Sequence, residues 1–288
     1  MAVPVQRLGI VGAGTMGTGI AQVAAQAGCT VWLVDVQPGA VERAIERVGE
    51  GLRRGVARGT IRDEERAAAL ARLHPAPDLR ALADCELVIE AVSEREPLKR
   101  EVFRELDAIA PPATILASNT SSISITRLAA ATRRPDRVVG MHFFNPVPVM
   151  RLVEVVRGVD TSDATVARVR ELAVALGKTP VEVRDYPGFV ANRLLMPMIN
   201  EAAYALMEGV ATAEAIDQAM TLGANHPMGP LALADLIGLD VCLDVMRVLH
   251  EGFGDDKYRP CPLLVNLVAA GRLGRKTGEG FFKYDGGR

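Results

Sequence analysis

The feature that most constrains this chain is a glycine-rich turn near its beginning, with the sequence Gly12-Ala13-Gly14-Thr15-Met16-Gly17. An apolar run at residues 8–11 precedes the turn, a helical pattern covers residues 16–27, and a second apolar run covers residues 30–36. Such apolar runs are typical of strands that are covered on both faces of a sheet. A G-x-G-x-x-G turn between a strand and a helix predicts a dinucleotide-binding unit.

Each position of the turn has a physical reason in that unit. Gly12 permits the tight turn, Gly14 lets the backbone approach a pyrophosphate, and Gly17 lets the helix pack closely on the strand. Thr15 and Met16 lie at the helix N-terminus, which faces the phosphates. A glycine turn that binds nothing is the alternative, and the strand and helix around it weigh against that interpretation.

The end of the second apolar run indicates which dinucleotide is bound. Asp35 lies 18 residues after Gly17, where a carboxylate can accept hydrogen bonds from the adenosine ribose hydroxyls. Its charge would repel a 2′-phosphate, and the next residues, Val36 and Gln37, provide no arginine for that phosphate. The sequence therefore predicts NAD rather than NADP.

The rest of the chain predicts two domains. Strand patterns that alternate with helices imply a mainly parallel sheet in a Rossmann-type α/β domain over residues 1–185. Amphipathic stretches at residues 39–56 and 63–73 predict a helical hairpin inserted in that domain. After residue 185 the pattern becomes helical, so we expect a smaller all-α domain over residues 186–288. The further strands are expected at residues 87–91, 114–117, 138–141, 152–156 and 180–183, and the later helices at residues 190–208, 212–222, 231–251 and 262–270.

Composition excludes several classes of protein. The chain has 33 Lys and Arg against 35 Asp and Glu, for a net charge of −2, and no dense basic block, so we expect no nucleic-acid partner. Residues 8–34 carry no charge, but six glycines argue against a membrane helix. The four cysteines lie far apart, which indicates reduced thiols in a cytoplasmic protein and no metal site.

One histidine is a candidate for proton transfer. His142 follows the strand expected at residues 138–141, at the edge of the sheet where ligands bind. Glu154 interrupts the apolar run at residues 152–156, and a carboxylate in such a strand needs a partner. If the two strands are neighbours, Glu154 could bond one ring nitrogen of His142 and leave the other to accept a proton. The pair could equally tie two strands together without a chemical role.

A polar loop, Ser118-Asn119-Thr120-Ser121-Ser122, follows the strand expected at residues 114–117. It therefore lies at the same edge of the sheet as His142. Such a loop could bind a ligand, or it could do no more than cap the helix that follows.

Five segments together resemble the short-chain L-3-hydroxyacyl-CoA dehydrogenases over nearly the whole chain, and the length resembles the 3-hydroxybutyryl-CoA dehydrogenases. The resemblance implies NAD-dependent oxidation of (S)-3-hydroxyacyl-CoA, with a short acyl chain, to 3-oxoacyl-CoA. The segments are the glycine turn extended through Ala21, the loop at residues 118–122, His-Phe-Phe-Asn-Pro-Val-Pro at 142–148, Pro-Gly-Phe-Val-Ala-Asn-Arg at 187–193 and Lys-Thr-Gly-Glu-Gly-Phe at 276–281.

The resemblance also implies catalytic roles. His142 would be the catalytic base, and Glu154 would orient it. Ser121 and Asn192 would hydrogen-bond the substrate's oxygen atoms. Because Asn192 lies beyond the domain boundary, the set would be complete only when the helical domain closes on the cofactor domain.

Further residues are implied around the cofactor. Asn145 would help to place the nicotinamide, and Ser121, Glu94, Lys99 and Lys276 would lie near the cofactor. Lys99 would also lie near the CoA moiety, although it could instead be a solvated helix residue.

The hairpin would supply cations to the CoA phosphates, and Arg53, Arg54 and Arg58 are available there. The family often has a small polar residue near Gly51 and a lysine near Arg58, so this chain departs from the family pattern at the expected CoA contacts. A solvated helix face is the alternative for these arginines.

Two other functions stay open on the sequence. One is an NAD-dependent dehydrogenase of a free hydroxy acid or sugar acid, and the other is a non-catalytic dinucleotide-binding protein. The helical pattern at residues 231–248 is too apolar for a small domain alone, which predicts a homodimer, as the resemblance also implies.

Overall fold

The computed structural model describes residues 3–284. The chain divides into two compact units, Met1–Tyr186 and Pro187–Arg288, and this division lies one residue from the boundary expected after residue 185. Each unit has its own buried apolar core. Across the described residues, no helix is both long enough and apolar enough to cross a membrane.

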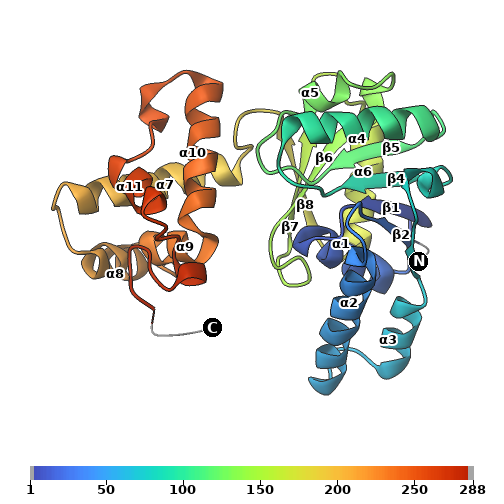
Figure 1. The fold of residues 1–288 in the computed structure, drawn as a ribbon, viewed down its shortest axis with the longest axis horizontal. Coiled ribbons are helices and arrows are strands. Elements are labelled where there is room, and N and C mark those ends of the chain that lie inside the picture. Colours follow the sequence, from blue (N-terminus) through green and yellow to red (C-terminus); the bar gives the residue numbers. More distant parts are fainter. Residues whose placement is uncertain (1–2, 285–288) are drawn as a thin grey trace. The chain divides into compact units, whose positions relative to one another are not determined.

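A mostly parallel sheet forms the centre of the first unit, which confirms the predicted α/β class (Figure 1). Its strands occur in the order β3-β2-β1-β4-β5-β6-β7-β8. The pair β6–β7 is antiparallel, and the other neighbouring pairs are parallel. The strands are β1 (Arg7–Val11), β2 (Thr30–Val34), β3 (Leu73–Pro75), β4 (Leu87–Glu90), β5 (Ile115–Ser118), β6 (Val138–Phe143), β7 (Leu152–Arg157) and β8 (Thr179–Arg184).

The strand order fixes where a ligand can bind. Strands β1 to β3 run outward from the centre in one direction, and β4 to β6 continue in the other. Because these strands are parallel, their carboxyl ends lie at one edge of the sheet. In such sheets ligands bind at that edge, at the point where the strand order reverses, which here lies between β1 and β4.

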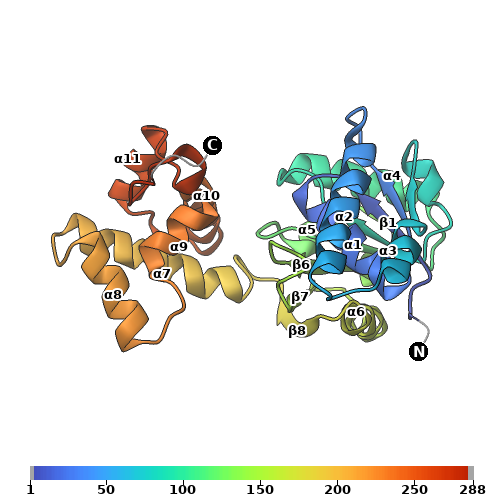
Figure 2. The ribbon, with the colours of Figure 1, turned by 90° about the horizontal axis from the view of Figure 1, so that it is seen from below.

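Helices cover both faces of the sheet. The core on one face contains apolar side chains of α1 (Thr15–Ala27), α2 (Ala40–Ala57) and α6 (Asp163–Ala175). Figure 2 shows α4 (Glu96–Ile109) on the side away from α6, and α5 (Ile125–Ala129) packs against α4. Short 3-10 helices occur at Leu79–Leu82, Pro135–Arg137, Asp256–Tyr258 and Arg275–Thr277.

The expected helical hairpin is present, but its end differs from the prediction. Helix α2 packs beside α3, which spans Asp63–Leu70 and does not continue to residue 73. The chain turns into β3 instead, because its backbone completes the edge of the sheet: Val31 N donates to Arg72 O at 2.8 Å, and Ala76 N donates to Leu33 O at 2.8 Å.

The second unit is helical, as the sequence predicts. However, the single helix expected at residues 231–251 is wrong, because Gly238 separates two helices with φ 107° and ψ 125°. That conformation is available to glycine and interrupts the helical hydrogen-bond pattern. The helices are α7 (Ala191–Met207), α8 (Ala213–Gly223), α9 (Pro230–Ile237), α10 (Leu239–Phe253) and α11 (Pro262–Ala269).

Candidate active site

The glycine turn has the shape that a pyrophosphate needs. Gly12 has φ 107°, and a Cβ there would lie 2.6 Å from the carbonyl oxygen of Ala91. A Cβ on Gly17 would lie 1.8 Å from Gly12 O, so this position admits only glycine. At Gly14, by contrast, the space around a Cβ is empty to 4 Å. The backbone above α1, which begins at Thr15, is therefore open to a ligand at the helix N-terminus.

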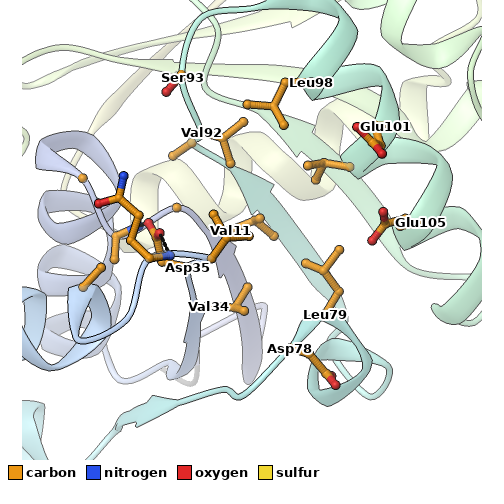
Figure 3. A pocket seen from close by; sticks show the side chains of 18 of the residues that line it. Val11, Val34, Asp35, Asp78, Leu79, Val92, Ser93, Leu98, Glu101 and Glu105 are labelled. Atoms are coloured by element: carbon orange, nitrogen blue, oxygen red, sulfur yellow. Dashed lines mark hydrogen bonds between the residues drawn. The ribbon is translucent and has the colours of Figure 1, made fainter.

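A pocket of about 1250 Å³ lies beside the turn, between the ends of the central strands and α4 (Figure 3). Its walls include Val11, Val34, Val92 and Leu98, which suit a flat apolar ring. Asp35 lines the same pocket, and its two oxygens accept bonds from the backbone N–H groups of Ala13 at 2.7 Å and Gln37 at 2.8 Å. The carboxylate is thus fixed directly beside the glycine turn.

Two arginines at the pocket were not predicted from the sequence. Arg43 and Arg47 both line it from α2, and Arg47 Nη2 donates to Ala13 O at 3.0 Å and to Thr18 Oγ1 at 3.3 Å. Their i, i+4 spacing puts both on one face of the predicted helix. That spacing, together with the hairpin's return toward the turn, is the signal that could have identified them.

A histidine and a carboxylate face each other across β6 and β7. His142 and Glu154 are directly paired in the antiparallel register, and His142 Nδ1 lies 2.8 Å from Glu154 Oε2. Both side chains are buried, and the ring of Phe144 lies 4.5 Å from the imidazole between centroids. With Glu154 ionised, Nδ1 carries the proton and donates it, which makes Nε2 the atom that can accept a proton.

The position of His142 in its strand differs from the prediction. β6 runs through Phe143 rather than ending at residue 141, so His142 lies inside the strand. The ladder continues because Phe143 pairs with Val153 of β7. The neighbouring strand therefore holds the imidazole from the side.

The polar loop after β5 is organised by Glu94. Its Oε1 accepts from Thr120 Oγ1 at 2.5 Å, from Ser121 N at 2.9 Å and from Ser122 N at 3.1 Å. Burial acts to raise the pKa of Glu94, but the charge of Lys99 and these donated bonds hold the pKa below its ordinary value. The structure thus brings Glu94 and Ser121 together.

Lys99 is not a solvated helix residue. Its side chain is fully buried, and Nζ lies 2.6 Å from Glu90 Oε1 and 3.3 Å from Glu94 Oε2. Glu90 was not predicted from the sequence. A charged residue at the end of the apolar run Leu87–Glu90 is nevertheless the same kind of signal that identified Glu154, because a carboxylate in an apolar strand needs a partner.

The contact of Asn119 with β6 was also not predicted from the sequence. Its Oδ1 accepts from Phe143 N at 2.9 Å, so the polar loop is bonded to β6 next to His142. Ordinary turn chemistry explains an Asn in such a loop, and only the position of β6 beside β5 gives this side chain its partner.

The remaining expected site residues are dispersed. Asn145 is exposed after β6. Arg53, Arg54 and Arg58 are exposed at the far end of α2 and just beyond it.

Two expected residues belong to the second unit. Asn192 is the second residue of α7. Lys276 is exposed, and its Nζ lies 2.6 Å from both oxygens of Asp240. Among the described residues, no cluster of three or more His, Cys, Asp or Glu side chains could hold a metal ion.

A glycine turn at a helix N-terminus beside a pocket, and a buried imidazole–carboxylate pair on the same sheet, are features that a nicotinamide-dependent dehydrogenase requires. Within that class, residues 7–186 match the family description "3-hydroxyacyl-CoA dehydrogenase, NAD binding domain", and residues 188–284 match "3-hydroxyacyl-CoA dehydrogenase, C-terminal domain". The chain belongs to the 3-hydroxyacyl-CoA dehydrogenase family, which confirms the predicted resemblance, NAD cofactor and activity class.

Similar proteins support this over the full chain. A 3-hydroxybutyryl-CoA dehydrogenase from Bradyrhizobium diazoefficiens is 54% identical over 288 residues, covering 100% of this chain and 98% of that protein. The crystal structure of (S)-3-hydroxybutyryl-CoA dehydrogenase PaaH1 from Ralstonia eutropha has a TM-score of 0.96 at 51% identity, covering 98% of this chain and 100% of that one. A 3-hydroxyadipyl-CoA dehydrogenase from Escherichia coli is 45% identical, covering 99% of this chain and 60% of that protein.

Proposed function

We propose that this NAD-dependent enzyme oxidises (S)-3-hydroxybutyryl-CoA, or a similar short (S)-3-hydroxyacyl-CoA, to the 3-oxoacyl thioester. The similar proteins from B. diazoefficiens and R. eutropha carry 3-hydroxybutyryl-CoA in their names, and this supports a short acyl chain. The name of the E. coli relative indicates a different acyl group, so the chain length is the part of the proposal that needs direct measurement.

The observation that carries the proposal is the buried His142–Glu154 pair. His142 Nε2 takes the proton of the substrate's 3-hydroxyl group, and Glu154 holds the ring and stabilises the imidazolium that forms. Bound NAD supplies the acceptor for the hydride that leaves C3. In the reverse direction the imidazolium returns the proton to the forming alkoxide.

Two polar side chains complete the proposed set. Ser121 donates to a substrate oxygen from the loop that Glu94 holds, and Asn192 does so from α7. Asn145 helps to place the nicotinamide. Asn192 belongs to the Pro187–Arg288 unit. We therefore assign NAD binding to the first unit and a share of substrate binding to the second.

The cofactor contacts are proposed around the glycine turn. Gly12, Gly14 and Gly17 with Thr15 and Met16 form the pyrophosphate cradle, and Asp35 has lone pairs for the ribose. We assign Glu94 and Ser121 to the nicotinamide end of the cofactor, with Lys99 behind them because its buried Nζ pairs with Glu94. Lys276 lies in the second unit.

We assign the CoA phosphates to the end of the hairpin. Arg54 and Arg58 are exposed there with Arg53, and guanidinium groups bind phosphate well.

The test is the loss of NADH absorbance with acetoacetyl-CoA, beside free acetoacetate and NADPH. We expect turnover with the CoA ester and NADH. His142→Gln should lower kcat by about 100- to 10,000-fold, because it removes the proton acceptor, and should leave the Kd for NADH nearly unchanged.

A matched control is His250→Gln, which removes an imidazole in the last turn of α10 and should keep the wild-type kcat. Turnover of free acetoacetate would contradict the proposed substrate, and wild-type activity of His142→Gln would contradict the proposed base.

We also propose that the protein is a homodimer through the Pro187–Arg288 unit. Large apolar side chains are exposed there, which is unusual unless a partner covers them. Light scattering at micromolar concentration should give about twice the 30.7 kDa of one chain, and a monomer mass would contradict the dimer. The exposed side chains are Leu194, Met207, Val210, Leu222, Leu236 and Val241.

A cytoplasmic location is a further part of the proposal. All four cysteines are free and buried, which suits a compartment that keeps thiols reduced. Cell fractionation should recover the native protein with the cytosolic fraction, and recovery with membranes would contradict this.

A further inference from the structure

A buried carboxylate lies beneath the loop that carries Ser121. Glu90 is the last residue of β4 and has 0% exposure. Its Oε1 accepts from Lys99 Nζ at 2.6 Å and from Val92 N at 2.7 Å, while Oε2 accepts from Ser118 Oγ at 2.6 Å. Glu90 therefore connects the end of β4 to α4 on one side and to the end of β5 on the other.

Both connections lead to the Ser121 loop. On the β5 side, Ser118 Oγ accepts from Thr120 N at 3.2 Å. On the α4 side, Lys99 lies between Glu90 and Glu94, and Glu94 accepts from the backbone N–H of Ser121. The loop is thus bonded on two sides to groups whose positions Glu90 fixes.

Stability alone is a poor reason for this arrangement. Burial raises the pKa of Glu90, so keeping it ionised against Lys99 costs desolvation free energy that the contact between them only partly offsets. Buried ion pairs of this kind can often be replaced by well-packed apolar residues without loss of stability. Such an ion pair instead fixes the positions of the groups around it. Here those groups belong to the Ser121 loop, which follows β5 at the ligand-binding edge of the sheet.

We propose that Glu90 is a positioning residue for the reaction, acting through Ser118 and through the Lys99–Glu94 pair to fix the Ser121 hydroxyl. The inference rests on the proposed role of Ser121 as a substrate-binding group. Glu90 has no contact with the reacting atoms in this role. Its effect reaches the chemistry only through the loop.

Glu90→Gln is the appropriate change because the side chain keeps its size. The remaining oxygen can accept from Lys99 and Val92. The new amide group can only donate toward Ser118, so the Ser118 hydroxyl has to turn and accept from it, and the negative charge opposite Lys99 is lost. Both connections to the loop are therefore weakened. Since small displacements of a positioned group cost up to about 100-fold in rate, we expect kcat with acetoacetyl-CoA to fall roughly 10- to 100-fold.

The decisive experiment is a double-mutant cycle on kcat with Ser121→Ala. If Glu90 acts by positioning the Ser121 hydroxyl, Glu90→Gln should have little further effect once that hydroxyl is absent. A purely structural role would lower the active fraction equally in both backgrounds, so the losses would multiply. Multiplied losses, or an unchanged kcat in Glu90→Gln, would overturn the inference.

Two further variants keep the test interpretable. Asp107→Asn disturbs another buried carboxylate, which is paired with Arg133 and Arg134, and should lower the melting temperature without lowering kcat. If Glu90→Gln does not fold, Ser118→Ala removes one hydroxyl from the same connection and should show the same dependence on Ser121. A wild-type kcat in Ser121→Ala would instead show that the proposed role of Ser121 is wrong, and the inference would fall with it.

Discussion

At the scale of single residues, the chain tolerates buried carboxylates by giving each one a specific partner. Glu154 bonds His142, and Glu90 is ion-paired with Lys99. An unpaired carboxylate in these positions would cost several kcal/mol. The same requirement that made Glu154 visible in the sequence therefore applies to Glu90.

Glu94 should make stability depend on pH on the acid side. Because its folded-state pKa lies below the ordinary 4.5, the unfolded chain binds the proton more tightly. The stabilisation is complete above the ordinary pKa and is lost as pH falls through the lowered pKa. We expect Glu94→Gln to melt lower than wild type at neutral pH and to lose less on acidification to about pH 4.

The measurement is thermal unfolding followed by circular dichroism over this pH range. Glu64→Gln removes the same charge from an exposed position on α3 and should follow the wild-type curve. Equal slopes for wild type and Glu94→Gln would show that the carboxylate contributes nothing to acid sensitivity.

The cysteines should be unreactive in the folded chain. Burial raises the pKa of Cys29 and Cys85 to about 11 and that of Cys242 to about 12, and the thiolate is the reactive form. We expect little reaction of the native protein with a disulfide reagent at about pH 8, and reaction of all four thiols in guanidinium. Rapid modification of the native chain would contradict the buried positions.

At the scale of elements, apolar runs and turn residues predicted most strands and helices to within a few residues. The prediction failed where tertiary context decides. The helix expected through residue 73 ends at Leu70 because the next residues complete the sheet edge beside β2. The helix expected across Gly238 is interrupted because that residue adopts φ 107°, and a backbone angle is not visible in an apolar pattern.

The break at Gly238 gives a direct prediction. A Cβ there would lie 2.9 Å from Asp240 Oδ1 and 3.0 Å from Lys276 Nζ, and the backbone conformation is strained for any other residue. Gly238→Ala should reduce the free energy of unfolding by about 1–3 kcal/mol in urea denaturation.

Gly49 provides the matched control, since it lies inside α2 and its Cβ would make an ordinary 3.8 Å contact with Leu70. Gly49→Ala should therefore stabilise by about 0.5–1 kcal/mol. Destabilisation of the same size in both variants would argue against a special role of the Gly238 backbone.

The candidate site shows the same division between what a sequence does and does not reveal. The glycine turn, Asp35 and the His142–Glu154 pair follow from position and residue type. Asn119 and Arg47 do not, because their partners, Phe143 N and Ala13 O, are brought near only by the sheet order and the return of the hairpin.

At the scale of the whole molecule, the segment that joins the two units starts from a fixed point. Asp185 accepts from Ser124 Oγ at 2.7 Å, from Thr126 N at 2.8 Å and from Ile125 N at 3.1 Å. It therefore bonds the beginning of α5, which follows the Ser121 loop, immediately before the first unit ends at Tyr186.

Loss of this anchor should affect turnover more than stability. Asp185→Ala removes a helix cap worth about 0.5–2 kcal/mol. It also removes the hydrogen bonds that hold the chain to the beginning of α5 just before the second unit begins. We expect kcat with acetoacetyl-CoA to fall while the fold is retained. Ser162→Ala removes the comparable cap of α6, where Ser162 Oγ accepts from Thr165 N at 3.3 Å, and should destabilise without lowering kcat. Equal kcat values in the two variants would contradict the role of the anchor.

The antiparallel pairing of β6 with β7 has a consequence for transplanting this chemistry. Since His142 and Glu154 are direct cross-strand partners, one hairpin carries both members, and a slip of a single residue would turn one of them to the opposite face. A designer could graft the pair onto any scaffold with one well-registered hairpin at a ligand cleft. In a set of such grafted scaffolds, activity would indicate which members have the correct strand register, without a structure determination for each one.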